Sequence, residues 1–326
     1  MARIVVVGSG IVGQATGKGF AEKGHAVRFV DIDAATIEKL RGAGLVAMTV
    51  SEVDWDDVDI VMLAVLTPTV NGRVVLDYIE TAALDVGRGL ATTDNFVTVV
   101  VRSTVPPTTT EKHIAPILER ASGKQLGRGF GLAMNPEFLR AASNEQDFAR
   151  PWITVVGAND ARTAATMDEL YRPFGAAVVH CTPTEAEMIK YVNNVYNAVK
   201  ISYFNEVHAI CAKVGLDGHL VGAAVSRSAE GMWNPLYGTR GGVPYGGACL
   251  PKDTEAFLQF ARGLGVGHLM LESTIEVNRR LESSVPAVPS PDKIDAVLDA
   301  VRRRGGALEE PEELLLEVGK SATTIL

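Results

Sequence analysis

The chain opens with a short apolar run that leads straight into a glycine-rich turn. The run spans residues 3–7, and the turn reads Gly8-Ser9-Gly10-Ile11-Val12-Gly13 before a segment with helical spacing. A strand, a G-x-G-x-x-G turn and a helix in this order are typical of a dinucleotide-binding βαβ unit. The first glycine permits the tight turn, the second lets the backbone approach a pyrophosphate, and the third lets the helix pack closely on the strand. We therefore predict dinucleotide contacts at Gly8, Gly10, Ile11, Val12 and Gly13, with the pyrophosphate at the positive end of the helix.

An acidic residue stands where the ribose of such a dinucleotide needs one. Asp31 ends the second predicted strand, residues 26–31. A carboxylate at this position accepts hydrogen bonds from both ribose hydroxyls, and its charge repels a 2′-phosphate. The sequence therefore predicts NAD rather than NADP as the cofactor. The alternative is a glycine-rich turn in an α/β protein that binds no cofactor.

Short β-branched runs alternate with helical stretches through the first half of the chain. Alternation of this kind predicts the α/β class, with a Rossmann-type doubly wound parallel sheet and crossover helices. The predicted strands are 3–7, 26–31, 59–65, 97–102, 130–134 and 152–157, and helical spacing is found at 11–23, 34–41, 109–121 and 162–172.

The pattern changes near Pro183. A stretch with helical spacing and no Gly or Pro runs from Thr184 to about Val214, which predicts one long helix. Helical spacing continues to about Leu281, interrupted by a glycine-rich loop at 238–247. We predict three parts: an NAD-binding Rossmann domain over 1–183, an all-helical central and dimerisation domain over 184–284, and a Pro-rich linker with a helical tail over 285–326.

Composition argues against several classes of function. The formal net charge of −8 disfavours a nucleic-acid partner, which requires a concentrated basic surface. The three cysteines, Cys181, Cys211 and Cys249, form no C-x-x-C pair, so we expect neither a disulfide framework nor a structural metal. No apolar run approaches the roughly 20 residues that span a bilayer. We expect a cytoplasmic protein without a leader, a membrane partner or a nucleic-acid partner.

Two patches in the second half of the chain carry reactive side chains. Lys190 and Asn194 are spaced i,i+4 on one face of the long predicted helix, where they could stabilise a developing alkoxide or simply face solvent. Cys249 follows the glycine-rich stretch Tyr245-Gly246-Gly247-Ala248 and precedes Lys252 and Asp253. Glycines let a substrate approach, and a nearby cation activates a thiol, so we predict that Cys249 is a nucleophile. We read Cys181 and Cys211 as small buried hydrophobes.

A third patch follows two apolar strands at the predicted carboxyl edge of the sheet. It combines Arg102-Ser103-Thr104-Val105-Pro106 with Asn135-Pro136-Glu137-Phe138-Leu139. Ligands bind at this edge in open α/β sheets. Thr104 and Glu137 could position a hydrolytic water, and either residue could instead cap a helix.

Five stretches in order along residues 1–280 resemble the UDP-glucose/GDP-mannose dehydrogenase family: the first strand with GSGIVG, then STVP, NPEFLR, EAEMIKYVNN and GGACLPKD. The resemblance implies two successive NAD-dependent oxidations of a sugar 6-hydroxyl to a carboxylate. It implies that Cys249 attacks the aldehyde to give a thiohemiacetal, which is then oxidised to a thioester. Lys190, Asn194 and a water held by Asp253 would stabilise oxyanions and move protons, and Glu137 with Thr104 would assist hydrolysis.

The resemblance also implies binding residues and a homodimer that pairs through the long helix. Tyr237 and Arg240 resemble the GDP-mannose branch, in which such an arginine reaches across from the partner subunit. The implied cofactor contacts beyond the glycine turn and Asp31 are Thr67, Ser103, Thr104 and Lys252. The implied substrate contacts are Phe138, Leu139, Lys190, Asn194, Asn197, Tyr237, Arg240, Tyr245 and Gly246.

The chain departs from the family pattern in several places. It resembles a shortened member that lacks the C-terminal nucleotide-binding domain, and Thr36, Ala141 and Ala248 replace a basic residue, a glutamate and a serine of the family. The default substrate is a nucleotide sugar, and a nucleoside, a sugar phosphate or a smaller alcohol would also fit. One alternative is a two-electron dehydrogenase of the 3-hydroxyacid type, with Cys249 incidental. Another is a non-catalytic NAD-binding partner or regulator.

Overall fold

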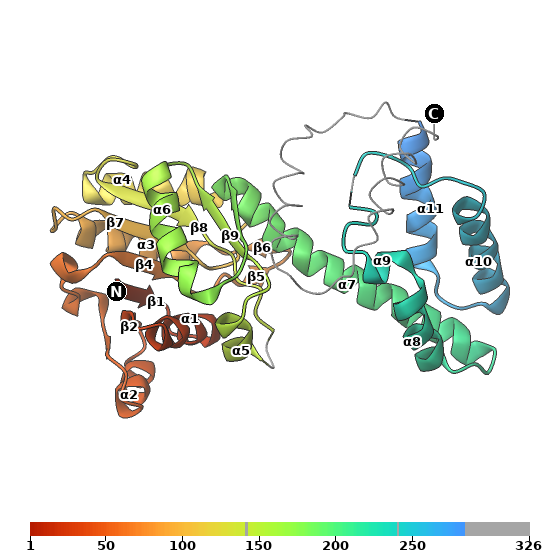
Figure 1. Cartoon of the computed structure of the whole chain (residues 1–326), viewed down its shortest axis with the longest axis horizontal. Coiled ribbons are helices and arrows are strands. Elements are labelled where there is room, and N and C mark those ends of the chain that lie inside the picture. The colour runs from red at the N-terminus through yellow and green to blue at the C-terminus, as the bar shows by residue number, and fades with distance from the viewer. Residues whose placement is uncertain (141–142, 240, 284–326) are drawn as a thin grey trace. The chain divides into compact units, whose positions relative to one another are not determined.

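The computed structural model describes residues 1–140, 143–239 and 241–283 (Figure 1). The predicted linker and tail, together with Arg240 and Ala141, lie outside the described residues. The chain divides into two compact units, the first ending at Lys190 and the second beginning at Tyr191. We describe each unit by itself, and the predicted domain boundary at 183/184 stays a prediction.

The first unit is built on an eight-stranded sheet in the order β10-β9-β8-β7-β4-β1-β2-β3. Its strands are β1 Arg3–Val7, β2 Ala26–Val30, β3 Ala47–Met48, β4 Ile60–Leu63, β7 Val97–Val101, β8 Phe130–Met134, β9 Thr154–Ala158 and β10 Val178–Cys181. Chain order reverses between β1 and β4, so the carboxyl ends of these two strands frame the crevice where ligands bind in such sheets. The predicted doubly wound α/β class is confirmed.

One strand pair departs from the predicted parallel sheet. β8 and β9 run antiparallel, with Met134 opposite Gly157. A parallel pair needs a crossover of a dozen or more residues, usually a long helix. The only helix between these strands among the described residues is α5, the short segment Asn144–Ala149. The prediction of a parallel sheet is wrong at this pair and holds at the other strand pairs of the sheet.

Helices cover both faces of the sheet because alternate strand residues point to opposite sides. Val5 and Val7 of β1 belong to one buried cluster, and Ile4 and Val6 belong to the other. The helices and helical turns of this unit are α1 Ile11–Glu22, α2 Ala34–Gly42, η1 Val50–Glu52, η2 Trp55–Asp57, α3 Asp77–Leu90, η3 Thr110–Ile114, α4 Ala115–Ser122, α5 Asn144–Ala149, α6 Ala161–Tyr171 and η4 Arg172–Phe174. Residues of α3 and α4 contribute to the first cluster, and residues of α1, α2, α5 and α6 to the second.

A small hairpin follows β4. Its strands β5 Thr69–Val70 and β6 Arg73–Val74 pair antiparallel across Asn71 and Gly72. Both turn residues have positive φ, 50° and 75°, as the tight turn of a two-residue hairpin requires. The sequence analysis did not predict this hairpin.

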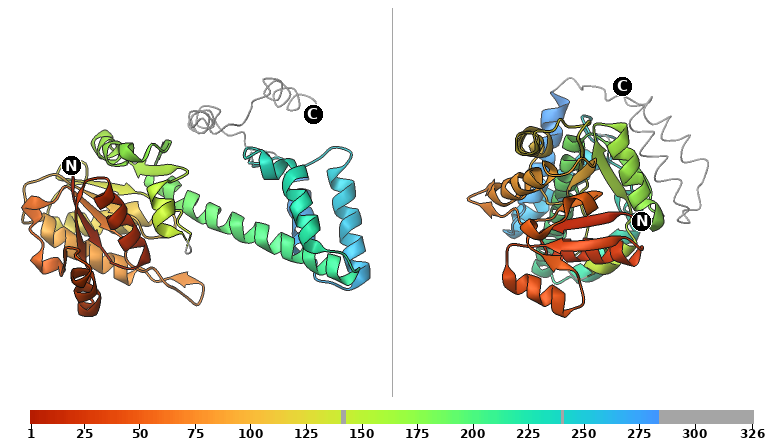
Figure 2. Two further views of the ribbon diagram at one scale, coloured as in Figure 1. Left: turned by 60° about the horizontal axis from the view of Figure 1, so that its bottom comes forward. Right: turned by 90° about the vertical axis from the view of Figure 1, so that its left-hand side faces the viewer.

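The second unit is helical. It contains most of α7 Pro183–Lys213, which is one continuous helix (Figure 2), and α8 Gly218–Ser228, α9 Glu230–Trp233, α10 Leu250–Leu264 and α11 Leu269–Glu282. The predicted long helix is confirmed. The buried core of the second unit consists of Ile210, Leu258, Ala261, Leu271 and Ile275, from α7, α10 and α11. In the part of the chain that the structure describes, no helix is long and apolar enough to cross a membrane.

Candidate active site

The three glycines of the turn after β1 have three different environments. Gly8 has φ +92°, a conformation that L side chains rarely adopt. A Cβ on Gly13 would lie 1.9 Å from the carbonyl oxygen of Gly8, so only glycine lets α1 approach the turn. A Cβ on Gly10 would meet nothing within 4 Å. The space in front of Gly10 is therefore open to a ligand, as the sequence predicts for a pyrophosphate.

Donor groups and a carboxylate flank this open space. No side chain caps α1 at Gly10, so the N–H groups of its first turn are available to an anion. The Asp31 carboxylate accepts hydrogen bonds from the backbone N–H of Ser9 at 2.7 Å and of Asp33 at 3.0 Å. These bonds hold the carboxylate at the end of β2. The residues present therefore fit a dinucleotide with a free ribose 2′-hydroxyl.

Exposed apolar side chains at the same edge were missed by the sequence analysis. Ile32 follows Asp31 and is 91% exposed, and Leu66 follows β4 and is 75% exposed. Ile11, which the sequence did predict, is 68% exposed at the start of α1. Apolar residues directly after strands at a sheet edge offer a surface for the flat face of a base. Their position after a strand was the signal that could have found them.

The predicted cofactor residues after β4 and β7 connect the two loops to each other. The Thr67 hydroxyl donates to the carbonyl of Thr104 at 2.7 Å. Ser103 is buried, and its hydroxyl donates to the carbonyl of Val65 at 2.6 Å. The two loops are fixed side by side at the carboxyl edge of the sheet. Whether these residues contact NAD stays a prediction.

Two predicted catalytic residues meet in the first unit. The Lys190 ammonium lies 2.9 Å from Oε1 of Glu137 and also donates to the Glu137 carbonyl. The side chains are only 5% and 13% exposed. Oε2 of Glu137 accepts from the N–H of Leu139 at 2.5 Å, and the ammonium lies 5.6 Å from the centre of the Phe138 ring. The structure thus brings two residues from separate motifs together in a buried ion pair, and their catalytic roles stay a prediction.

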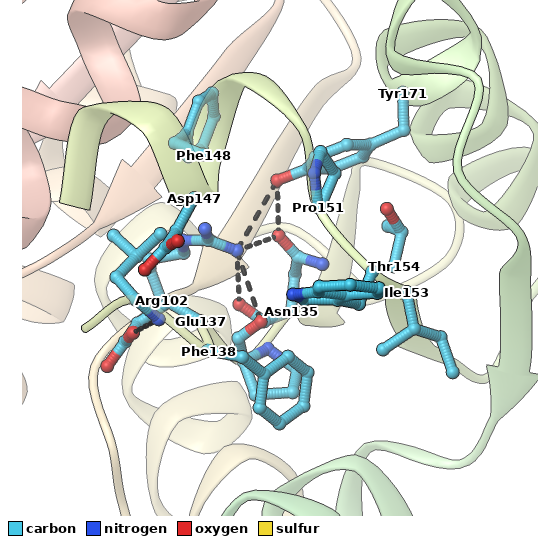
Figure 3. Close-up of a pocket in the computed structure, with 13 residues that line it drawn as sticks. Arg102, Asn135, Glu137, Phe138, Asp147, Phe148, Pro151, Ile153, Thr154 and Tyr171 are labelled. Carbon is cyan, nitrogen blue, oxygen red and sulfur yellow. Dashed lines mark hydrogen bonds between the residues drawn. The ribbon is translucent and has the colours of Figure 1, made fainter. Parts of the chain in front are cut away.

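A buried polar cluster holds the segment just before Glu137 (Figure 3). Nη1 of Arg102 donates to the carbonyls of Asn135 and Pro136 at 3.1 and 3.2 Å and to Oδ1 of Asn135 at 2.5 Å. The Tyr171 hydroxyl donates to the same Oδ1 at 2.5 Å, and burial raises the pKa of Tyr171. The amide of Asn135 donates to the carbonyl of Val155 at 2.7 Å. The roles of Arg102 and Asn135 were not predictable from the sequence, because their partners are far apart in the chain.

This cluster forms the floor of a pocket that also includes two predicted substrate residues. Glu137, Phe138 and Leu139 line it together with Trp152, whose side chain is 83% exposed. The full lining is Arg102, Asn135, Pro136, Glu137, Phe138, Leu139, Asp147, Phe148, Pro151, Trp152, Ile153, Thr154 and Tyr171. The pocket brings the NPEFL stretch together with Phe148 of α5, Trp152 after it and Tyr171 of α6.

The predicted nucleophile belongs to the second unit. Cys249 is exposed and directly precedes α10, and Lys252 and Asp253 form an exposed ion pair in the first turn of that helix. By contrast, Cys211 is buried and Cys181 is partly buried. Gly247 has φ +78°, which the tight loop before Cys249 requires.

The remaining predicted residues of the second unit that the structure describes are exposed or partly exposed. Asn194 and Asn197 are exposed on α7, Tyr237 is 47% exposed, and Tyr245 is partly buried. Arg240 lies outside the described residues. The implied joint action of Cys249 on the aldehyde carbon and of Lys190 on its oxygen involves residues of different units and stays a prediction. Among the described residues there is no group of three or more side chains suited to hold a metal ion.

Comparison with protein families matches both units. The NAD binding domain of the UDP-glucose/GDP-mannose dehydrogenase family matches residues 2–48 and 41–175, and the central domain of that family matches residues 184–280. The predicted cofactor, NAD, is thereby confirmed.

Curated proteins and solved structures agree with this match. The UDP-glucose 6-dehydrogenase of Haloferax volcanii is 37% identical over 301 residues, which is 84% of this chain and 68% of that protein. The GDP-mannose 6-dehydrogenase of Pseudomonas aeruginosa is 32% identical over 340 residues, 98% of this chain and 78% of that protein. The crystal structure of a ternary complex of GDP-mannose dehydrogenase from Pseudomonas aeruginosa superposes with a TM-score of 0.80 at 34% identity, covering 86% of this chain and 69% of that chain.

Proposed function

The chain belongs to the UDP-glucose/GDP-mannose dehydrogenase family, and on that premise we propose that it oxidises the sugar C6 hydroxyl of a nucleotide sugar to a carboxylate through a covalent intermediate on Cys249. Membership makes it an NAD-dependent oxidoreductase. The contact that carries the proposal is the buried pair of Lys190 and Glu137, because it places a cation next to a carboxylate that also lines a pocket.

The proposed reaction balances as follows. Two-electron oxidation of the alcohol gives an aldehyde, and the sulfur of Cys249 then bonds to the aldehyde carbon while the thiol proton passes to the oxygen. Removal of two further electrons and two protons converts this thiohemiacetal into a thioester. Water adds to the thioester carbon, the carbon–sulfur bond breaks, and the thiol and the carboxylic acid are released. When bound, NAD supplies the oxidising power for both oxidations, two electrons each time.

Lys190 is suited to stabilise oxygen atoms that gain negative charge. A lysine ammonium has three donors, and two of them meet Glu137 in the first unit. The third donor is available for a substrate oxygen. Because the side chain is nearly fully buried, such a bond is stronger than it would be in water.

Glu137 is suited to accept the proton of the hydrolytic water. One of its oxygens faces Lys190 and the other accepts from the N–H of Leu139, so the carboxylate is fixed and its charge is balanced. A carboxylate held in this way can take a proton at a defined position. Thr104, at the edge of the same sheet, is proposed to orient the water, and Asn194 and Asp253 are proposed to assist from the second unit.

The stoichiometry of NADH formation tests the proposal. With UDP-glucose and GDP-mannose as probes, we expect two NADH per sugar oxidised with one of them, and no carboxylate product from Cys249→Ser. Cys181→Ser is the matched control and should retain turnover, because Cys181 ends β10 and is only partly exposed. One NADH per substrate with an indifferent Cys249 would instead assign the two-electron chemistry of a 3-hydroxyacid-type enzyme. Tight NAD binding without turnover of any alcohol or aldehyde would indicate a non-catalytic role.

We also propose that the protein is a homodimer that pairs through α7. Val192, Val195, Tyr196, Val199 and Tyr203 are between 37% and 58% exposed, and their spacing places them on one face of the helix. The neighbouring helices α8 and α9 bury none of their residues. A helical unit with so little buried core needs a partner surface, and a second copy supplies a self-complementary one.

The oligomeric state can be measured directly. Sedimentation should give a dimer, and Val195→Glu with Val199→Glu should shift it toward the monomer. Lys213→Glu, at the end of the same helix, is the control and should leave the dimer intact. A wild-type monomer at micromolar concentration would contradict this proposal. The exposed thiol that the mechanism requires is kept reduced in the cytoplasm, where we place the enzyme.

A further inference from the structure

The loop that leads into Cys249 has little to hold it in one conformation. Gly246 and Gly247 lie between Tyr245 and the cysteine, and a Cβ on either glycine would meet nothing within 4 Å. Among the described residues, no hydrogen bond joins Gly246, Gly247 or Ala248 to another element of the fold, and only a local turn spans residues 247–249. Glycine loses more conformational freedom on ordering than any other residue. A nucleophile at the end of such a loop needs contacts with another part of the fold to fix its position.

Asn278 on α11 provides a tie at the start of this loop. Its Oδ1 accepts from the N–H of Tyr245 at 2.7 Å, and its Nδ2 donates to the carbonyl of the same residue at 3.1 Å. The side chain is 7% exposed, and Nδ2 also donates to Glu282 at 3.2 Å. One planar amide thus satisfies both backbone groups of Tyr245. A primary amide is suited to this geometry because it places a donor and an acceptor side by side.

The other end of the loop is also fixed to α11. Cys249 directly precedes α10, and α10 packs on α11 through Leu258 and Ala261 against Leu271 and Ile275. Both ends of the five-residue segment from Tyr245 to Cys249 are therefore held against α11. Asn278 holds the Tyr245 end, and the packing of α10 on α11 holds the Cys249 end. With both ends held, few conformations of the two glycines can connect them.

We infer that Asn278 is a positioning residue for the thiol of Cys249. The inference rests on the proposed function, because it concerns the step in which the thiol bonds to the aldehyde. Catalysis by a nucleophile depends on the placement of the reacting atom, and small displacements are costly. Loss of the amide would free Tyr245 and let the loop sample conformations in which the sulfur is misplaced. The first oxidation, which does not use the thiol, should be unaffected.

Single-turnover kinetics separates the two oxidations. With enzyme in excess over UDP-glucose or GDP-mannose, whichever is turned over, NADH should form in two phases. Asn278→Leu removes both hydrogen bonds to Tyr245. It should leave the rate of the first phase within about twofold of the wild-type rate and slow the second phase by about ten- to a hundredfold. Asn278→Asp keeps the acceptor for the N–H of Tyr245 and should slow the second phase less. Arg280→Leu, exposed on the same helix, is the matched control and should slow neither phase.

The outcomes are distinguishable. Urea unfolding of each variant measures its stability. If Asn278 had a purely structural role, the free energy of unfolding would fall, and the two phases, per folded enzyme, would either keep their wild-type rates or slow equally. Either pattern would overturn the inference. If Cys249→Ser abolished the second phase while Asn278→Leu and Asn278→Asp slowed neither, the role of Asn278 alone would fail. If Cys249→Ser changed neither phase, the proposed function would fail as well. Should Asn278→Leu not fold, Asn278→Asp decides.

Discussion

Replacing Gly10 by alanine should weaken cofactor binding without cost to the fold. Gly10 precedes α1 with φ −72° and ψ −165°, a conformation that alanine adopts without strain. A Cβ at this position would meet no protein atom within 4 Å. The methyl group would instead occupy the space in which we place the pyrophosphate of NAD. The free energy of unfolding should therefore rise slightly while the affinity for NAD falls.

The magnitudes follow from this geometry. Without NAD, Gly10→Ala should raise the free energy of unfolding by about 0.5 kcal/mol, since alanine restricts the unfolded chain at a compatible site. Displacing the pyrophosphate should cost at least one charge-assisted hydrogen bond to the first turn of α1, about 1.5–3 kcal/mol. The Kd for NAD should rise by about ten- to a hundredfold.

Two further glycine substitutions complete the experiment. Gly42→Ala, at the end of α2, also adds a Cβ in open space and should match Gly10→Ala in stability while binding NAD normally. Gly13→Ala puts a Cβ 1.9 Å from the Gly8 carbonyl and should lower the free energy of unfolding by about 3 kcal/mol. Urea unfolding and NAD titration by calorimetry measure both quantities. Wild-type NAD affinity in Gly10→Ala, or a clear loss of its stability without NAD, would refute the reasoning.

Three other changes have defined outcomes. Lys190→Met should lower the free energy of unfolding by about 3 kcal/mol, because it leaves the Glu137 carboxylate buried and unpaired, and adding Glu137→Gln should restore most of it in urea titrations. Burial raises the pKa of Glu187 above 4.5, despite the N–H groups of Thr110 and Thr108 that it accepts from. Its contribution to the free energy of unfolding is therefore present below pH 4.5 and lost as the pH rises through the raised pKa. Urea titrations from pH 4 to 7 should show this fall in the free energy of unfolding, and Glu187→Gln should lack it. Asp31→Ser removes the charge that repels a 2′-phosphate, so the ratio of kcat/KM for NAD over NADP should fall by about tenfold or more in initial-rate assays.

Local patterns were sufficient to predict six strands of the sheet and the glycine turn, whereas the short edge strands β3 and β10 were missed. The apolar run of β1, in which Ile4 to Val7 are all buried, lies within the strand itself, and Gly8 and Gly13 satisfy short-range requirements. Helix α3 was not among the helical stretches identified from spacing, although it contributes to the core. It contains Gly87 and Gly89, which weaken a helix by propensity. Tertiary packing requires them, since a Cβ on Gly89 would lie 1.9 Å from the Trp55 ring.

The candidate site was predictable by residue type but not by what holds it. Lys190, Glu137 and Cys249 stood out because charged and nucleophilic groups in short motifs point to chemistry. Arg102 and Asn278 did not stand out, because each acts on the backbone of a residue 33 positions away. Hydrogen bonds over that separation leave no periodic or motif-level trace in the sequence. Only the folded chain brings such partners together.

The side chains that hold the two reactive segments in place are needed for the same physical reason. The carbonyls of residues 135–137 and both backbone groups of Tyr245 lie in irregular backbone, outside the helix and strand ladders, and must still be satisfied when buried. Arg102 and Lys190 donate to the three successive carbonyls 135–137, and Asn278 satisfies both groups of Tyr245. A loop can carry reactive groups because side chains from distant elements replace the missing ladder. These contacts are directional, so they fix the position of Glu137 and of the Cys249 loop more narrowly than apolar packing would.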